Sequence, residues 1–143
     1  MVLAQSQMTP ASALNARPVT LAVIVGNRGF FPAHLAGEGR NIILQILEKA
    51  GIRAIITPEG DTNVGAIESL KEATLCAELF RQHRDEIDGV LVTLPNFGDE
   101  RAIANTIRMS GLNVPVLIHA FPDNATGIVT DESDLRSSAP AFL

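Results

Sequence analysis

Two segments that are apolar on both faces restrict the fold of this chain more than any other feature. They span residues 19–25 and 89–94. A strand of this kind needs cover on both sides, as in a parallel sheet with helices above and below. Two further strands are expected, one at residues 53–57, where Pro58 ends it, and one at residues 115–120, where Pro115 is the first residue. The sequence therefore predicts four parallel strands.

Helical periodicity fills the gaps between these strands. It predicts helices over residues 39–50, 64–87 and 99–109, with Gly51 and Gly111 following two of them in a position that favours a left-handed residue. The residues expected to face inward are Ile42, Ile43, Ile46, Leu47 and Ala50 in the first helix; Ile67, Leu70, Thr74, Ala77 and Phe80 in the second; and Ala102, Ile103, Thr106 and Ile107 in the third. The alternation predicts an α/β fold, a doubly wound parallel sheet of flavodoxin or Rossmann type with strand order 2-1-3-4.

The chain divides into one domain with two irregular ends. Residues 1–17 have no periodicity and are expected to form a disordered leader, residues 18–131 form the α/β domain, and residues 132–143 form a loop-like tail. Four strands and three helices make a thin domain. We therefore expect a truncated or excised domain whose sheet is completed by domains that follow it.

Charge and cysteine content exclude several classes of function. The net charge is −5 and the eleven basic residues are dispersed, so neither nucleic acid nor an anionic membrane is an expected partner. Cys76 is the only cysteine, which excludes an internal disulfide, and its apolar surroundings predict a buried thiol. No apolar stretch reaches the roughly 18–20 residues of a membrane span, and residues 1–16 lack the features of a secretory signal. A cytoplasmic protein is expected.

A ligand site is expected where the order of the parallel strands reverses, between the first and third strands. The loops there cover residues 26–32 and 95–101. Five of their residues are the candidate binding residues: Asn27, Arg28, Gly29, Asn96 and Asp99. Asp61 and His119 follow or end the two outer strands and flank this crevice.

Phosphate, metal and nucleophile motifs are missing from the sequence. The first loop has Gly26 and Gly29 but not the three glycines of a dinucleotide fingerprint, and no P-loop is present. Asp99 and Glu100 would repel a phosphate at the start of the helix that they open. His34, His83 and His119 are scattered, so no metal-ligand spacing is formed. No cofactor is expected in this chain, and catalytic residues are expected to be absent.

The residue types that remain in the crevice suit a neutral polyol. Sugar hydroxyls both donate and accept hydrogen bonds, which favours Asn, Asp and Arg, and sugar C–H faces favour aromatic rings such as Phe30, Phe31 and Phe97. A structural alternative stays open. In it the two Asn residues turn the chain, Asp99 caps a helix, the Phe rings lie beneath loops, and Arg28 pairs with an acid such as Asp61 or Asp99.

Three stretches of the chain resemble the amino-terminal part of the L-fucose and L-arabinose isomerases. They are NRGFFP with GEGR at residues 27–32 and 37–40, GVLVTLPNFGDE at residues 89–100, and VPVLIHAFPD at residues 114–123. The resemblance runs from about Val19 to about Asp131 and covers only the opening part of such an enzyme.

The resemblance implies an aldose–ketose isomerase in which a divalent metal, typically Mn²⁺, is held by carboxylates and a His in later domains. It also implies that this domain contributes to homo-oligomer contacts and helps to cover the sugar substrate, with Arg28 matching a substrate-contacting position. The chain alone would then be inactive. Two alternatives remain, a non-catalytic sugar-binding or sugar-sensing module and an assembly domain without a ligand.

Overall fold

The computed structural model describes residues 17–122, so residues 1–16 and 123–143, which include the expected tail, lie outside the described part. The elements in chain order are β1 (Thr20–Val25), α2 (Ala33–Lys49), β2 (Arg53–Ile56), the 3₁₀ turn η1 (Asn63–Gly65), α3 (Leu70–Gln82), β3 (Gly89–Leu94), α4 (Glu100–Ser110) and β4 (Val116–Ala120). All strand pairs are parallel, and the order is β2-β1-β3-β4. The predicted doubly wound fold and strand order are confirmed.

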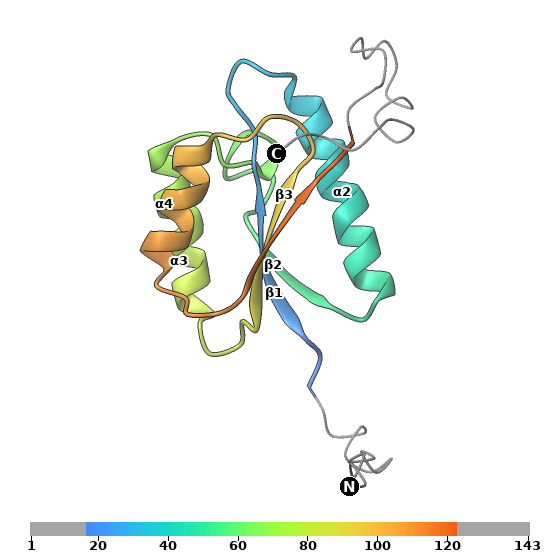
Figure 1. The fold of residues 1–143 in the computed structure, drawn as a ribbon, viewed down its shortest axis with the longest axis vertical. Coiled ribbons are helices and arrows are strands. Elements are labelled where there is room, and N and C mark those ends of the chain that lie inside the picture. Colours follow the sequence, from blue (N-terminus) through green and yellow to red (C-terminus); the bar gives the residue numbers. More distant parts are fainter. Residues whose placement is uncertain (1–16, 123–143) are drawn as a thin grey trace, which may run out of the picture.

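The sheet separates two helical layers (Figure 1). Successive side chains of a strand point to opposite faces. Ala22 and Ile24 of β1 therefore belong to the core beneath α3 and α4, whereas Val23 belongs to the core beneath α2. Phe80 of α3 is fully buried in the larger core. This two-sided burial explains why β1 and β3 are apolar on both faces.

Two helices have boundaries that differ from the sequence prediction. The helix expected at residues 64–87 is α3, which is shorter at both ends. Val64 and Gly65 have positive φ values of 52° and 72° in η1, and Ala66 is extended. The helix begins only after Ser69, whose hydroxyl accepts a hydrogen bond from the Glu72 N–H and caps it. The first helix, by contrast, begins six residues earlier than expected, directly after Pro32.

The buried face of α3 also differs from the predicted one. Leu70 is 61% exposed and Thr74 is exposed, whereas Ile67 is buried outside the helix. The buried residues of α3 are Ala73, Cys76, Ala77 and Phe80. In α2, Ile43 and Leu47 are buried as expected, but Ile46 and Ala50 are exposed. The inward face predicted for α4 is confirmed for Ala102 and Thr106.

Strand β4 lies at the edge of the described sheet. Its side chains Val116, Leu117 and Ile118 are 44%, 64% and 53% exposed, although they have the apolar character of an interior strand. This exposed apolar edge contrasts with β3, where five of the six residues are buried.

Candidate functional site

The loops after β1 and β3 meet at the carboxyl end of the sheet, at the top of Figure 1. A Cβ built on Gly26 would lie 2.7 Å from Leu94 Cδ2 and 3.4 Å from the Gly98 Cα, and a Cβ on Gly98 would meet Leu94 Cδ2 at the same distance. The Asp99 N–H also donates a hydrogen bond of 3.2 Å to the Asn27 carbonyl oxygen. The two glycines thus lie where a side chain would displace the tip of Leu94, and their backbones approach each other closely. The two predicted loops are therefore in contact at the predicted crevice.

The extended segment before α3 supplies a third wall that the sequence analysis missed. The Ile67 N–H donates to the Val25 carbonyl oxygen at 2.8 Å, and Ile67 forms a parallel bridge with Gly26. Because the Gly26 N–H is already bonded to Thr93 of β3, this segment runs along the opposite edge of β1. Strand β2, which pairs with this edge of β1, ends at Ile56, and the segment around Ile67 pairs with β1 beyond that point. This pairing brings the next residue, Glu68, to the crevice.

Asn27 is fully buried and holds the side chain of Glu68. Its Nδ2 donates a hydrogen bond of 2.7 Å to Glu68 Oε1, which also accepts one of 3.3 Å from Asn63 Nδ2. The Asn27 Oδ1 atom is buried without a hydrogen-bond partner among the described residues. A buried amide oxygen without a partner is unusual and calls for a physical reason.

Arg28 bridges the two loops in the described structure. Its Nη2 donates to Glu100 Oε2 and, at 3.4 Å, to the Gly98 carbonyl oxygen. The paired acid is thus Glu100, and neither Asp61 nor Asp99 contacts the guanidinium. The pKa of Glu100 lies below its ordinary value because of a hydrogen bond to its own backbone N–H and because of the Arg28 charge. The Arg28 side chain is 35% exposed and that of Glu100 is 76% exposed, so this ion pair contributes little to stability.

Three further candidate residues have distinct positions. Asp99 caps α4, because its Oδ1 accepts a hydrogen bond of 2.8 Å from the Ala102 N–H, which confirms the structural alternative for this side chain. The Nδ2 atom of Asn96 is buried without a partner among the described residues. A Cβ on Gly29 would lie 3.6 Å from Glu68 Oε2, so Gly29 lies against the carboxylate.

An aromatic row borders these polar groups. The ring centroids of Phe30 and Phe31 are 4.8 Å apart, and those of Phe31 and Phe97 are also 4.8 Å apart. Phe30 is 79% exposed and Phe97 is 59% exposed, so burial beneath loops does not account for either ring. Two large exposed rings beside hydrogen-bonding groups form a surface that suits the C–H face of a sugar.

The flanking candidates lie apart from these contacts. His119 pairs through Nδ1 with the Thr93 hydroxyl at 3.1 Å and packs edge-on against Phe121. Asp61 is exposed in the turn after β2. Within the described residues, neither side chain forms a hydrogen bond or ion pair with the five candidate residues of the crevice.

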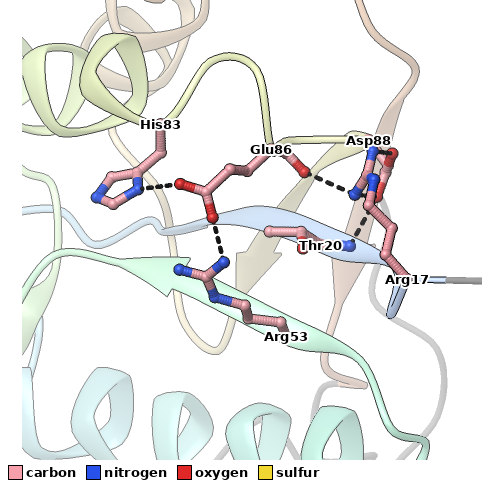
Figure 2. Close-up of polar contacts among 6 residues, drawn as sticks. All are labelled: Arg17, Thr20, Arg53, His83, Glu86 and Asp88. Carbon is pink, nitrogen blue, oxygen red and sulfur yellow. Dashed lines mark hydrogen bonds and ion pairs between the residues drawn. The ribbon is translucent and has the colours of Figure 1, made fainter.

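A second polar network lies at the opposite, amino end of the strands (Figure 2). Arg17 binds Asp88 at 2.6 Å, the Thr20 N–H donates to the same carboxylate at 2.8 Å, and Arg53 and His83 both contact Glu86. The Thr20 N–H and then Arg17 lower the pKa of Asp88. The hydrogen bonds from His83 and then Arg53 lower the pKa of Glu86.

A hollow of about 160 Å³ borders this network, with Arg17 and Arg53 in its lining. Both guanidinium groups already bind carboxylates, so the hollow offers no free cation for an anionic ligand. Ligands of open parallel sheets bind at the carboxyl ends of the strands. We therefore place the candidate site at the crevice and assign the network to stability.

Within residues 17–122, no three His, Cys, Asp or Glu side chains come together as a metal site. No helix in this part of the chain is long and apolar enough to cross a bilayer.

A family comparison identifies the family of the chain. The model of the fucose/sulfoquinovose isomerase N-terminal domain matches residues 22–136, which is most of the chain. The chain belongs to this family. The resemblance to fucose isomerases is confirmed, and that to arabinose isomerases stays a prediction. Searches of curated proteins and of solved structures gave no significant match.

Proposed function

We propose that this chain is the amino-terminal domain of an aldose–ketose isomerase, where it covers the substrate site and contributes to oligomer contacts while other domains supply the catalytic residues. The observation that carries the proposal is the crevice itself, in which Arg28 and the amides of Asn27 and Asn96 lie in the loops that bear the exposed rings of Phe30 and Phe97. Family membership supports the reaction class.

Within the crevice we assign sugar contact to Arg28, whose guanidinium is partly exposed. Asn27, Gly29, Asn96 and Asp99 form the walls, and ligand hydroxyls would satisfy the amide atoms that have no partner if the loops open slightly. A cytoplasmic location is part of the same proposal.

The divalent metal that the family resemblance implies does not fit the described residues, because they bring no three ligands together. In the complete enzyme such a metal would polarise the carbonyl and hydroxyl oxygens between which the isomerisation occurs. We assign no residue of this chain to it.

Sugar binding to the chain tests the crevice. Titration of the ¹⁵N-labelled chain with L-fucose should shift the amide signals of the loops after β1 and β3. Arg28→Ala should weaken binding roughly tenfold to a hundredfold, which corresponds to the loss of a charged hydrogen bond of about 1.5–3 kcal/mol. In the complete isomerase the same variant should lower kcat/KM by a similar factor.

The matched control is Arg108→Ala, because Arg108 is an exposed arginine on α4 whose guanidinium contacts only Asn105 among the described residues. It should leave sugar binding unchanged. If Arg28→Ala instead lowers the unfolding free energy by several kcal/mol and leaves affinity intact, Arg28 is a loop clamp and the substrate assignment is wrong.

The assembly role is supported by the apolar side chains that β4 exposes, since monomeric proteins rarely present such an edge. Sedimentation equilibrium should detect self-association of the chain. Leu117→Lys should reduce it, because a charge on an edge strand opposes pairing with another edge. A clean monomer over a wide concentration range would count against the assembly role.

A further inference from the structure

We propose that Glu68 determines substrate class at the crevice, so that this domain accepts a neutral sugar and rejects an anionic one such as a sulfonated or phosphorylated sugar. The inference rests on the proposed function, because it assumes that the crevice meets the sugar. It concerns a residue outside the predicted candidate set.

One buried and one exposed amide fix the position of the Glu68 carboxylate. Oε1 accepts a hydrogen bond of 2.7 Å from Asn27, which is fully buried, and one of 3.3 Å from Asn63, which is exposed. The Ile67–Gly26 bridge holds the backbone immediately before Glu68 against the end of β1. The side chain is therefore held at the crevice mainly by the buried amide of Asn27.

The second carboxylate oxygen is available to a ligand. None of the described residues donates a hydrogen bond to Oε2, and the side of Oε2 toward the first loop is bordered by Gly29, which has no side chain. A larger residue at position 29 would project toward this oxygen. Glu68 is half-buried, so Oε2 can accept a hydrogen bond from a hydroxyl group that enters the crevice.

The charges of the crevice loops favour a neutral ligand. The crevice residues include the carboxylates of Glu68, Asp99 and Glu100, whereas Arg28 already binds Glu100. Arg101 is exposed on α4 and makes no hydrogen bond or ion pair with a crevice residue within residues 17–122. A sulfonate or phosphate would meet an uncompensated negative charge, whereas a hydroxyl group would gain a charge-assisted hydrogen bond.

The family description names both kinds of sugar, since fucose is neutral and sulfoquinovose carries a sulfonate. Two probes that differ only in this group are 6-deoxyglucose and 6-deoxy-6-sulfoglucose. We expect the chain to bind the neutral probe at least about tenfold more tightly in NMR titrations, an effect that one unit charge readily exerts on another near a protein surface. Glu68→Gln should largely remove this preference, because it deletes the charge and leaves an amide oxygen for the Asn27 hydrogen bond.

The matched control is Glu48→Gln, which deletes one negative charge at the exposed far end of α2 and should leave the preference unchanged. A salt titration of the wild-type chain tests the same charge effect without relying on a variant that must fold. Raising the ionic strength from about 0.02 M to about 0.5 M should reduce the ratio of the two probe affinities, because screening weakens interactions between exposed charges.

The outcomes separate the two proposals. If both probes bind and Glu68→Gln leaves their ratio unchanged, Glu68 does not select the substrate, although the crevice still binds sugar. If the anionic probe binds more tightly than the neutral one, the assignment of substrate class is overturned. If neither probe shifts the signals of the crevice loops, the proposed sugar-binding function fails, and the role of Glu68 fails with it.

Discussion

Two glycines in α2 allow a matched test of how the crevice is built. A Cβ on Gly39 would lie 2.3 Å from Pro95 Cβ and 2.4 Å from Pro95 Cγ, which is about 1 Å closer than the 3.4 Å at which ordinary contact begins. Pro95 is buried, and its ring cannot rotate away. A Cβ on Gly37, two residues earlier in the same helix, would meet Val64 Cβ at an ordinary 3.5 Å.

The two Gly→Ala substitutions should therefore have effects of opposite sign. Each gains up to about 1 kcal/mol from the helix preference of Ala over Gly. Gly37→Ala should keep most of this gain. Gly39→Ala adds an overlap with a rigid ring, and overpacking of this kind costs typically 1–3 kcal/mol or more. We expect a net loss of about 1–2 kcal/mol for Gly39→Ala and a gain of about 0.5–1 kcal/mol for Gly37→Ala.

Urea and thermal unfolding followed by circular dichroism measure the difference. For a domain of this size, each kcal/mol shifts Tm by about 4–8 °C, so the two variants should differ by at least about 6 °C. Gly39→Ala should also disturb the amide signals of Asn96 and Phe97, because Pro95 precedes them in the loop. If both substitutions stabilise the chain equally, the close contact between Gly39 of α2 and Pro95 in the loop after β3 is refuted.

Three further predictions concern ionisation, thiol reactivity and metal binding. The pKa values of Asp88 and Glu86 lie below their ordinary values of 3.8 and 4.5, so the stability that they contribute is present above those values and is lost as the pH falls through the folded pKa values. Tm should fall between about pH 5 and pH 2, and Asp88→Asn should flatten this fall, whereas Asp85→Asn, which changes an exposed acid nearby, should not. Burial raises the pKa of the Cys76 thiol to about 11, so iodoacetamide should label Cys76 only at the rate of unfolding, and rapid labelling of the native chain would contradict its burial. The chain should neither bind Mn²⁺ tightly nor isomerise an aldose, and calorimetry that found a low-micromolar Kd with defined stoichiometry would overturn this prediction.

Much of the fold could be predicted from the sequence because its signals are local. Continuous apolar runs mark β1 and β3 as strands covered on both sides, and turn residues mark where elements end. Gly111 has a φ of 63° after α4, and Asp99 caps its start. These features depend on the conformation of one residue or on a period of two or 3.6 residues, which short stretches of sequence contain.

Only the tertiary structure decided the third wall of the crevice. Residues 64–69 continue the apolar period of α3, so the sequence favours helix there, yet the Ile67 N–H bonds to the Val25 carbonyl oxygen and holds this segment extended beside β1. The partner lies 42 positions earlier, and no local pattern encodes such a hydrogen bond. The same contact places Glu68 against Asn27, which is fully buried. The sequence by itself determined the strands and the sheet edge at which a site should lie, because both depend on local periodicity. The side chains that face a ligand there were decided by long-range packing.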